Sequence, residues 1–165
     1  MLITKDEFKN SGMPTSQDII GSTAEPSKEV DIAITTVEEY YLKPRLTDQH
    51  YIDLLSNPTI GDNPVILNGG NLLVGNNTRH FAGLKQGLYH LVFAYLLVYH
   101  YNRLTRYGSV RKDSEYSRDP DLEDLYAQAK IQWEIGMTFV DEVLNYYNLD
   151  TDRNNLPNLF ETIAW

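Results

Sequence analysis

Cysteine is absent from this chain of 165 residues. Its absence excludes a disulfide framework, a thiolate nucleophile, and zinc or iron-sulfur sites with cysteine ligands. Basic residues are few: 14 lysines and arginines stand against 23 aspartates and glutamates, which gives a formal net charge of −9. Because binding to phosphates requires clustered positive charge, this balance argues against a general nucleic-acid-binding protein.

Long apolar runs are also missing. The most apolar stretch, residues 88–101, contains His90 and His100 and is shorter than the roughly 20 apolar residues that a membrane-spanning helix needs. The first residues are acidic where a signal peptide would be basic, so no targeting segment is expected. We expect a protein of the cytoplasm or of a virus particle, with no membrane association.

No catalytic or ligand-binding pattern stands out. His80, His90 and His100 are ten residues apart, which on a helix separates them by about 280°, so they would not share a face as metal ligands. The glycine-rich residues 68–71 lack the Lys-Ser/Thr of a phosphate-binding loop. Carboxylates at residues 38–39 and 121–124 fall at helix positions that we expect to be exposed. We expect no enzyme, no metal and no cofactor.

Tyrosine, by contrast, is abundant. The chain has 12 tyrosines, 5 phenylalanines and 2 tryptophans. Tyrosine joins a large apolar ring to a polar tip and is favoured at protein interfaces. The composition therefore points to a protein that contacts other proteins.

The predicted fold is mainly α: a bundle of about four main helices with a small β-hairpin and extended N- and C-terminal arms. Residues 1–27 are expected to be an arm with a short helix, which begins at a Thr4–Glu7 capping box. Apart from the pair Ile19 and Ile20, residues 11–27 are mostly polar and rich in turn formers, so their order is expected to depend on a partner.

Residues 28–147 are predicted to form the helical domain. The apolar spacing predicts a helix from residue 28 that ends at Pro44, then a tight corner, then a short helix from Thr47 to Asn57. A long helix that begins after residues 75–78 and runs to about Arg106 is apolar almost all round and is expected to be central.

A second long helix is predicted from Asp119, the N-cap, and Pro120, the first helical residue, to about Tyr147. Trp133 lies in the middle of its apolar stripe, which runs from Leu122 to Leu144. Trp133 is therefore expected to anchor this helix against the other long helix.

The β-hairpin is predicted near residues 65–74, with Gly69 and Gly70 in the turn between two apolar strands. Both faces of such strands are apolar, so one face could contact a neighbouring subunit through Ile66 and Leu73, or both could be buried within the domain. Residues 148–165 are expected to be a polar arm with an apolar end. The further interface candidates are those of the two arms: Ile19, Ile20, Leu159, Phe160, Ile163 and Trp165.

Three segments together resemble a known family. Residues 37–46, followed by Tyr51 and Leu54-Leu55, resemble the "YIKPxLG…Y…LL" segment of head-tail connector proteins of tailed bacteriophages, of the type found in Bacteroides-infecting phages, including the crAss-like group. Leu67-Asn68-Gly69-Gly70 and Phe81-Ala82-Gly83-Leu84-Lys85 resemble the "LNGG" and "FxGLK" segments of that family. The resemblance covers residues 28–147, and Thr47 stands where glycine is expected.

The resemblance implies an α-helical subunit of a ring, commonly of twelve copies, between the capsid portal and the tail. Double-stranded DNA would pass through the lumen without sequence-specific binding, and the portal and tail or further neck proteins would be the partners. The protein would be found in the neck of the virion, and in the host cytoplasm during assembly. Two alternatives stay open: another virion completion protein or helical protein-binding module, and a small helical enzyme or its regulatory subunit.

Overall fold

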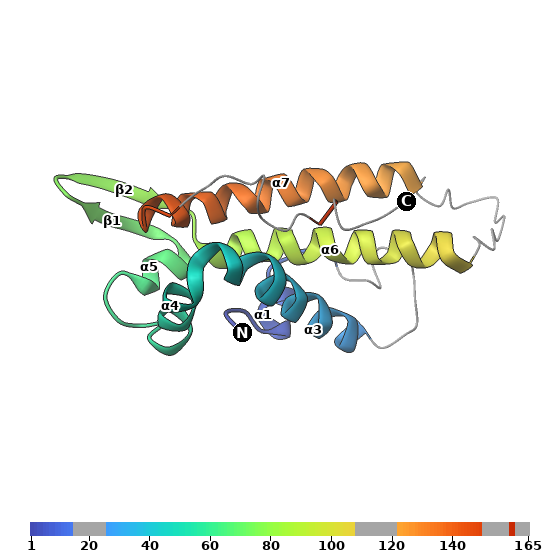
Figure 1. The fold of residues 1–165 in the computed structure, drawn as a ribbon, viewed down its shortest axis with the longest axis horizontal. Coiled ribbons are helices and arrows are strands. Elements are labelled where there is room, and N and C mark those ends of the chain that lie inside the picture. The colour runs from blue at the N-terminus through green and yellow to red at the C-terminus, as the bar shows by residue number, and fades with distance from the viewer. Residues whose placement is uncertain (15–25, 108–121, 150–158, 161–165) are drawn as a thin grey trace.

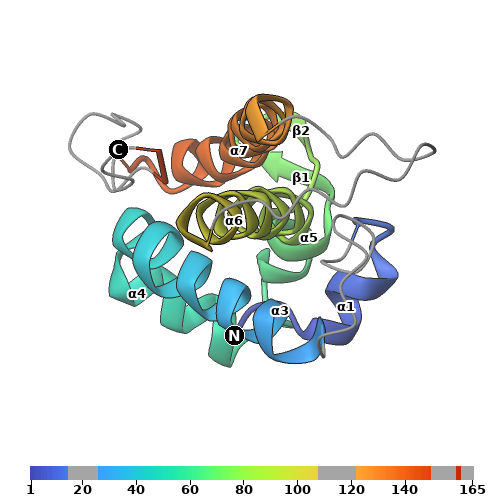
Figure 2. The same ribbon diagram turned by 90° about the vertical axis from the view of Figure 1, so that its right-hand side faces the viewer.

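A computed structural model describes residues 1–14, 26–107, 122–149 and 159–160. Its two longest helices, α6 (Leu84–Tyr107) and α7 (Leu122–Tyr146), lie side by side and antiparallel (Figure 1). Helix α6 lies between α7 and a layer of shorter helices (Figure 2). Its residues from Leu91 to Leu97 are almost all buried, as expected of a helix that is apolar around most of its circumference. The predicted mainly α fold with one small hairpin is confirmed.

The N-terminal segment packs against the helical body. Helix α1 (Lys5–Asn10) begins with the predicted capping box, in which Thr4 Oγ1 accepts from the backbone N–H of Glu7 at 3.2 Å and the Glu7 carboxylate accepts from that of Thr4 at 2.7 Å. Ile3 and Phe8 are fully buried. Over residues 1–14 the predicted arm is therefore part of the core, while Ile19 and Ile20 lie outside the described residues.

Helix α3 (Pro26–Thr36), the π-helix η1 (Val37–Leu42) and α4 (Lys43–Ser56) follow one another without a loop. The predicted end at Pro44 is wrong. Pro44 lies near the start of α4 and the helix runs through it from η1, so proline does not end the helix here. The chain instead bends at Thr47, which has φ 64° and ψ 154°. The helix that leaves this bend ends at Ser56, as predicted from Asn57-Pro58.

The hairpin lies later in the chain than predicted. Residues 65–67 belong to helix α5 (Asn63–Asn68), because Pro64 begins a helix and Gly69 ends it. Strand β1 (Gly70–Val74) pairs antiparallel with β2 (Asn77–Phe81), and Val74 faces Asn77 across the turn. Residues 79–81, expected at the start of the long helix, thus belong to the second strand, and α6 begins only at Leu84.

Helices α6 and α7 approach each other closely at a pair of glycines. A Cβ added to Gly136 of α7 would lie 2.9 Å from the carbonyl oxygen of Gly87 in α6 and 2.7 Å from a methyl group of Leu91. A Cβ added to Gly87 would lie 3.0 Å from the carbonyl oxygen of Gly136. Any larger residue at either position would push the two helices apart.

Trp133 is buried, as expected of an anchor, and its ring contacts aromatic residues of η1 and of the C-terminal segment. Its ring meets that of Tyr41 in η1 edge to face at 5.0 Å and that of Phe160 at 6.2 Å. Leu159 is also buried and belongs to the core. The described part of the predicted C-terminal arm is therefore packed on the domain. The proposed cap residues Asp119 and Pro120 lie outside the described residues.

Candidate functional site

The base of the hairpin is built from glycines of two separate segments. Gly69 ends α5 with φ 90°, and Gly83 precedes α6 with φ 100°. A Cβ on Gly83 would lie 2.6 Å from the backbone nitrogen of Gly69, and one on Gly69 would lie 2.8 Å from the carbonyl oxygen of Ala82. Positive φ and this close approach both require glycine. Gly69 joins α5 to β1 and Gly70 is the first residue of β1, so neither forms the predicted hairpin turn.

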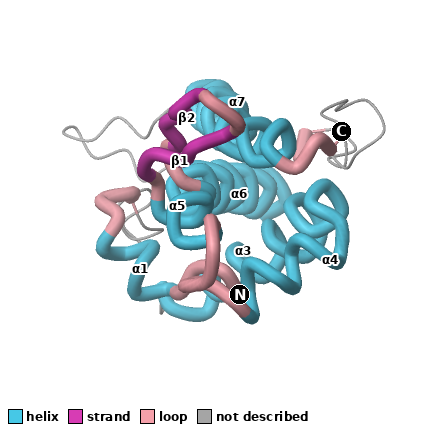
Figure 3. Tube along the Cα trace, turned by 90° about the vertical axis from the view of Figure 1, so that its left-hand side faces the viewer, coloured by secondary structure: helices cyan, strands magenta, loops and turns pink. Residues whose placement is uncertain are grey.

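The hairpin projects from one end of the helical body (Figures 1 and 3). Leu72 is buried, whereas Leu73 is 74% exposed. The first four residues of β2 are exposed and polar, so the hairpin that forms is not apolar on both faces, unlike the hairpin expected over residues 65–74. Among the described residues only β1 and β2 pair in this sheet, so the outer edge of each strand has no strand partner there. The hairpin therefore offers one exposed leucine and two unpaired strand edges to another protein.

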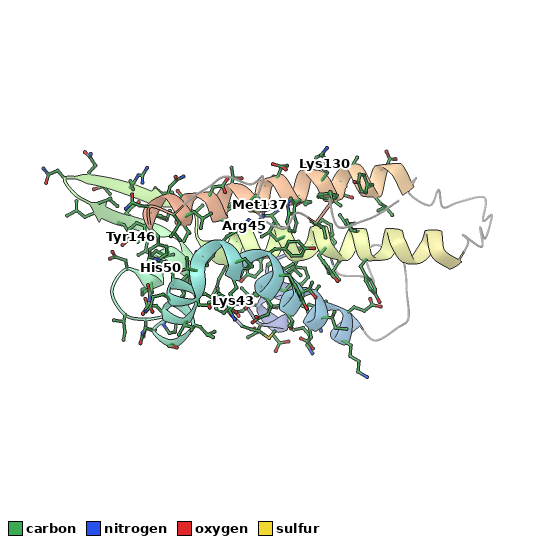
Figure 4. All side chains as sticks on the ribbon, in the orientation of Figure 1. Lys43, Arg45, His50, Lys130, Met137 and Tyr146 are labelled. Atoms are coloured by element: carbon green, nitrogen blue, oxygen red, sulfur yellow. The ribbon has the colours of Figure 1, made fainter. Side chains whose placement is uncertain are left out.

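A cleft of about 380 Å³ lies at the same end, between the loop before α5 and the end of α7. Asp53 accepts hydrogen bonds from the side-chain amides of Asn57 at 2.8 Å and Asn63 at 3.0 Å, and Asp62 accepts one from the Tyr146 hydroxyl at 2.5 Å. Figure 4 shows Tyr146 above the part of α4 that carries His50. The lining residues are Asp53, Asn57, Ile60, Gly61, Asp62, Asn63, Ile66, Tyr146 and Tyr147.

The hydrogen bonds in this cleft shift several pKa values. The bond to Asp62, together with burial, raises the pKa of Tyr146 to about 12. Burial and the charges of Asp53 and Asp62 raise the pKa of Tyr147 to about 12. The amides of Asn63 and Asn57 lower the pKa of Asp53. At neutral pH the cleft therefore carries a negative charge at Asp53 beside two neutral tyrosine hydroxyls.

A second polar cluster, buried beneath the N-terminal segment, surrounds Glu38 of η1. The Glu38 carboxylate accepts from the backbone N–H of Leu2 at 2.8 Å, from that of Ile3 at 3.2 Å and from the Tyr51 hydroxyl at 2.8 Å. Burial, and then the charge of Glu38, raise the pKa of Tyr51. Glu38 thus fastens the first residues of the chain to η1 and α4.

The exposed position predicted for Glu38 is wrong, since its side chain is only 1% exposed, whereas that of Glu39 is 48% exposed. The π-helix explains the difference. Its wider turn rotates the residues after Val37 relative to an α-helix, so a face read with a period of 3.6 residues is displaced.

The predicted interface residues fall into three groups. Leu73 is exposed at the hairpin, and Phe160 is half-buried against the rings of Tyr126 and Trp133. Ile66 and Leu159 are buried in the core, which excludes them as contacts for a partner. Four others lie outside the described residues: Ile19, Ile20, Ile163 and Trp165.

The cleft residues were not predicted. Asp53, Asp62 and Tyr146 are brought together from two distant parts of the sequence by the packing of α7 on the loop before α5. No spacing rule connects them. The only related signal in the sequence is the unusual number of tyrosines, which does not single out Tyr146.

The histidines lie apart in the fold. His80 is in β2, not on the long helix as its spacing from His90 had suggested, and it contacts the Asn71 side chain at 3.0 Å. His90 contacts the Gln132 side chain at 2.7 Å. Within the described ranges, no three histidine or acidic side chains are grouped as a metal site would require. Over the same ranges, no helix combines the length and apolar character needed to cross a bilayer.

Comparisons with known proteins identify a family but no function. No curated protein and no solved structure matches the chain. A family of unknown function, DUF6712, matches residues 36–159, a range that includes η1, the hairpin and both long helices. Because this range covers most of the sequence, the chain belongs to the DUF6712 family.

Proposed function

We propose that the chain is a structural, non-enzymatic subunit of a ring at the portal vertex of a tailed bacteriophage. The ring, of about twelve copies by resemblance to head-tail connectors, joins the capsid portal to the tail and lets DNA pass through its lumen. The virion neck is then its final location, and the host cytoplasm is where it assembles. Its excess of acidic residues would repel DNA phosphates and favour sliding over binding.

One observation carries this proposal. The two segments that resemble the "LNGG" and "FxGLK" motifs meet at the base of the hairpin, where Gly69 and Gly83 touch. The hairpin that they support projects from the body and exposes Leu73. A rigid base beneath an exposed apolar residue suits an element that contacts another protein.

The direct test uses particles of the phage that encodes the chain. Mass spectrometry of purified virions should detect the protein at roughly twelve copies, and a reconstruction of the portal vertex should place it between portal and tail. Absence from virions would refute the proposal. Presence elsewhere in the particle would also refute it, in favour of another completion protein.

A matched pair of variants tests the role of the hairpin. Leu73→Asp should leave the thermal midpoint of the isolated protein unchanged, because the side chain is 74% exposed, but should prevent incorporation into particles. Leu55→Asp on α4, where leucine is 40% exposed, serves as the control and should be incorporated normally. Normal incorporation of Leu73→Asp would remove the observation on which the proposal depends.

A further inference from the structure

The cleft of about 380 Å³ beside the hairpin holds two carboxylates that have no cationic partner. Asp53 and Asp62 both line it, and among the described residues neither forms an ion pair. Their hydrogen bonds come from neutral amide and hydroxyl groups. Residues 46–78, which supply most of the cleft wall, contain three aspartates and no lysine or arginine. The described part of the chain therefore leaves the negative charge of the cleft without a counter-charge.

Tyrosine rings line the same cleft. Tyr146 and Tyr147 meet edge to face at 5.1 Å, and the ring of Tyr147 is stacked on that of His50 at 4.0 Å. The charges of Asp53 and Asp62 both raise the pKa of Tyr147, so both carboxylates lie near its hydroxyl. A tyrosine ring attracts a cation, and a carboxylate attracts the same charge. The rings and the carboxylates thus favour one kind of ligand.

From this arrangement we infer that the cleft binds a basic side chain, arginine or lysine, of a partner protein. Its volume lies near the lower end of the range of about 300–1,000 Å³ that is typical of ligand pockets, which suits a single side chain. Asp53 and Asp62 accept hydrogen bonds from the charged head group. Ile60, which is 63% exposed and lines the same cleft, offers apolar surface to the methylene chain.

The position of the cleft favours a partner protein as the source of this cation. The cleft lies at the end of the molecule from which the hairpin projects, where Leu73 is 74% exposed (Figure 1). An anionic cleft and an exposed leucine at one end suit a partner that presents a basic residue beside an apolar patch. The proposed function places a partner at the hairpin, and in that respect the inference rests on it.

The test in solution uses the full-length protein and three capped single residues as probes: the N-acetyl N-methylamides of arginine, lysine and citrulline. Citrulline has nearly the shape of arginine but no charge. The side-chain amides of Asn57 and Asn63 donate to Asp53, so their NMR signals should shift and saturate with at least one of the two charged probes. They should not shift with citrulline. Equal shifts with citrulline, or no shift with either charged probe, would overturn the inference.

Isosteric variants locate the binding site. Asp53→Asn and Asp62→Asn remove one charge each, and each should weaken binding of the charged probe several-fold. Asp48→Asn is the matched control, because this aspartate also belongs to α4 but its side chain is 81% exposed and it does not line the cleft. It should leave binding unchanged. Equal weakening by all three variants would mean that the probe responds to surface charge in general, and would overturn the site.

A further variant tests whether the chain supplies its own cation. Arg153→Gln replaces an arginine that lies outside the described residues, and it should bind the charged probe as the parent does. Tighter binding by Arg153→Gln would show that the cleft holds this arginine, and would overturn the assignment to a partner.

The assignment to a partner protein is tested in particles. The double variant Asp53→Asn with Asp62→Asn should be incorporated into virions several-fold less than Asp48→Asn, and equal incorporation would overturn the assignment. The probe experiment needs neither portal nor virion, so it separates the inference from the proposed function. Binding of the probe by a protein that is absent from the portal vertex would support the site and refute the connector function. A protein located at the portal vertex that binds neither charged probe would refute the site alone.

Discussion

Replacing Glu38 by alanine should be among the most damaging single changes in the N-terminal half of the fold. The substitution removes the acceptor for three buried donors: the backbone N–H groups of Leu2 and Ile3 and the Tyr51 hydroxyl. An unsatisfied buried donor costs about 1–3 kcal/mol. Because residues 1–3 can move out to water and recover part of this loss, we expect a net cost of about 3–5 kcal/mol for the three donors together.

Glu39→Ala is the matched control for this prediction. Glu39 is the next residue of η1, its side chain is 48% exposed, and within the part of the chain that the structure describes it pairs only with Lys43. An exposed pair at this spacing contributes about 0.3–0.5 kcal/mol. Urea denaturation monitored by circular dichroism should therefore separate the two variants by several kcal/mol.

Hydrogen exchange adds a readout that is specific to the cluster. In Glu38→Ala the amides of residues 2–8 should exchange much faster than in the parent, because Glu38 fastens this segment to η1. In Glu39→Ala they should not change. Equal stability of the two variants, together with unchanged exchange of residues 2–8, would refute the role assigned to Glu38.

Four further results are expected. Thr47→Gly should raise the free energy of unfolding by about 1 kcal/mol, since relief of about 1–3 kcal/mol of strain at φ 64° exceeds the entropic cost of glycine; a lower thermal midpoint would contradict this. Gly136→Ala should lower it by about 1–3 kcal/mol in urea denaturation through steric overlap with α6, and an unchanged midpoint would show that the helices can separate freely. Leu159→Ala should cost about 2–5 kcal/mol by the same measurement, whereas a loose arm would lose nothing. The pKa of Tyr146 is raised to about 12, so the part of the stability that comes from its protonated hydroxyl is fully present below pH 10 and is lost as the pH rises towards 12. In an absorbance titration of tyrosinate, Asp62→Asn should move the ionisation of Tyr146 to lower pH, and an unmoved curve would exclude the hydrogen bond to Asp62 as the cause of the raised pKa.

The features that sequence predicted well are governed by residues close together in the chain. The Thr4–Glu7 capping box satisfies its donors within four residues, so its outcome depends little on the rest of the fold. The end of α4 is likewise determined by neighbouring residues, because Pro58 disfavours a helical conformation at Asn57. The buried position of α6 could be predicted because a helix that is apolar on all sides has no stable place at a surface.

The hairpin was predicted too early in the chain because a short apolar run does not show whether its residues follow the period of a strand or that of a helix. Residues 65–67 fit a buried strand and a single helical turn equally well. The sequence has two turn signals, at residues 68–71 and at residues 75–77, and the apolar runs on both sides of the first favour a hairpin turn there. Which one closes the hairpin depends on Gly83, which must meet Gly69 at the base. That contact spans 14 positions and is visible only in the fold.

Interface residues were misassigned for a related reason. Ile66 was expected to belong to a strand that is apolar on both faces, and Leu159 to an apolar end beyond a polar stretch, but both side chains are buried. A better criterion was present in the sequence. Ile131 and Ile135 fall off the apolar stripe that predicts the buried face of α7, and Ile32 falls off the corresponding stripe of α3. Large apolar side chains on the polar side of a helix have no use in the core of a single copy, so they are the residues on which a test for contact between copies should begin.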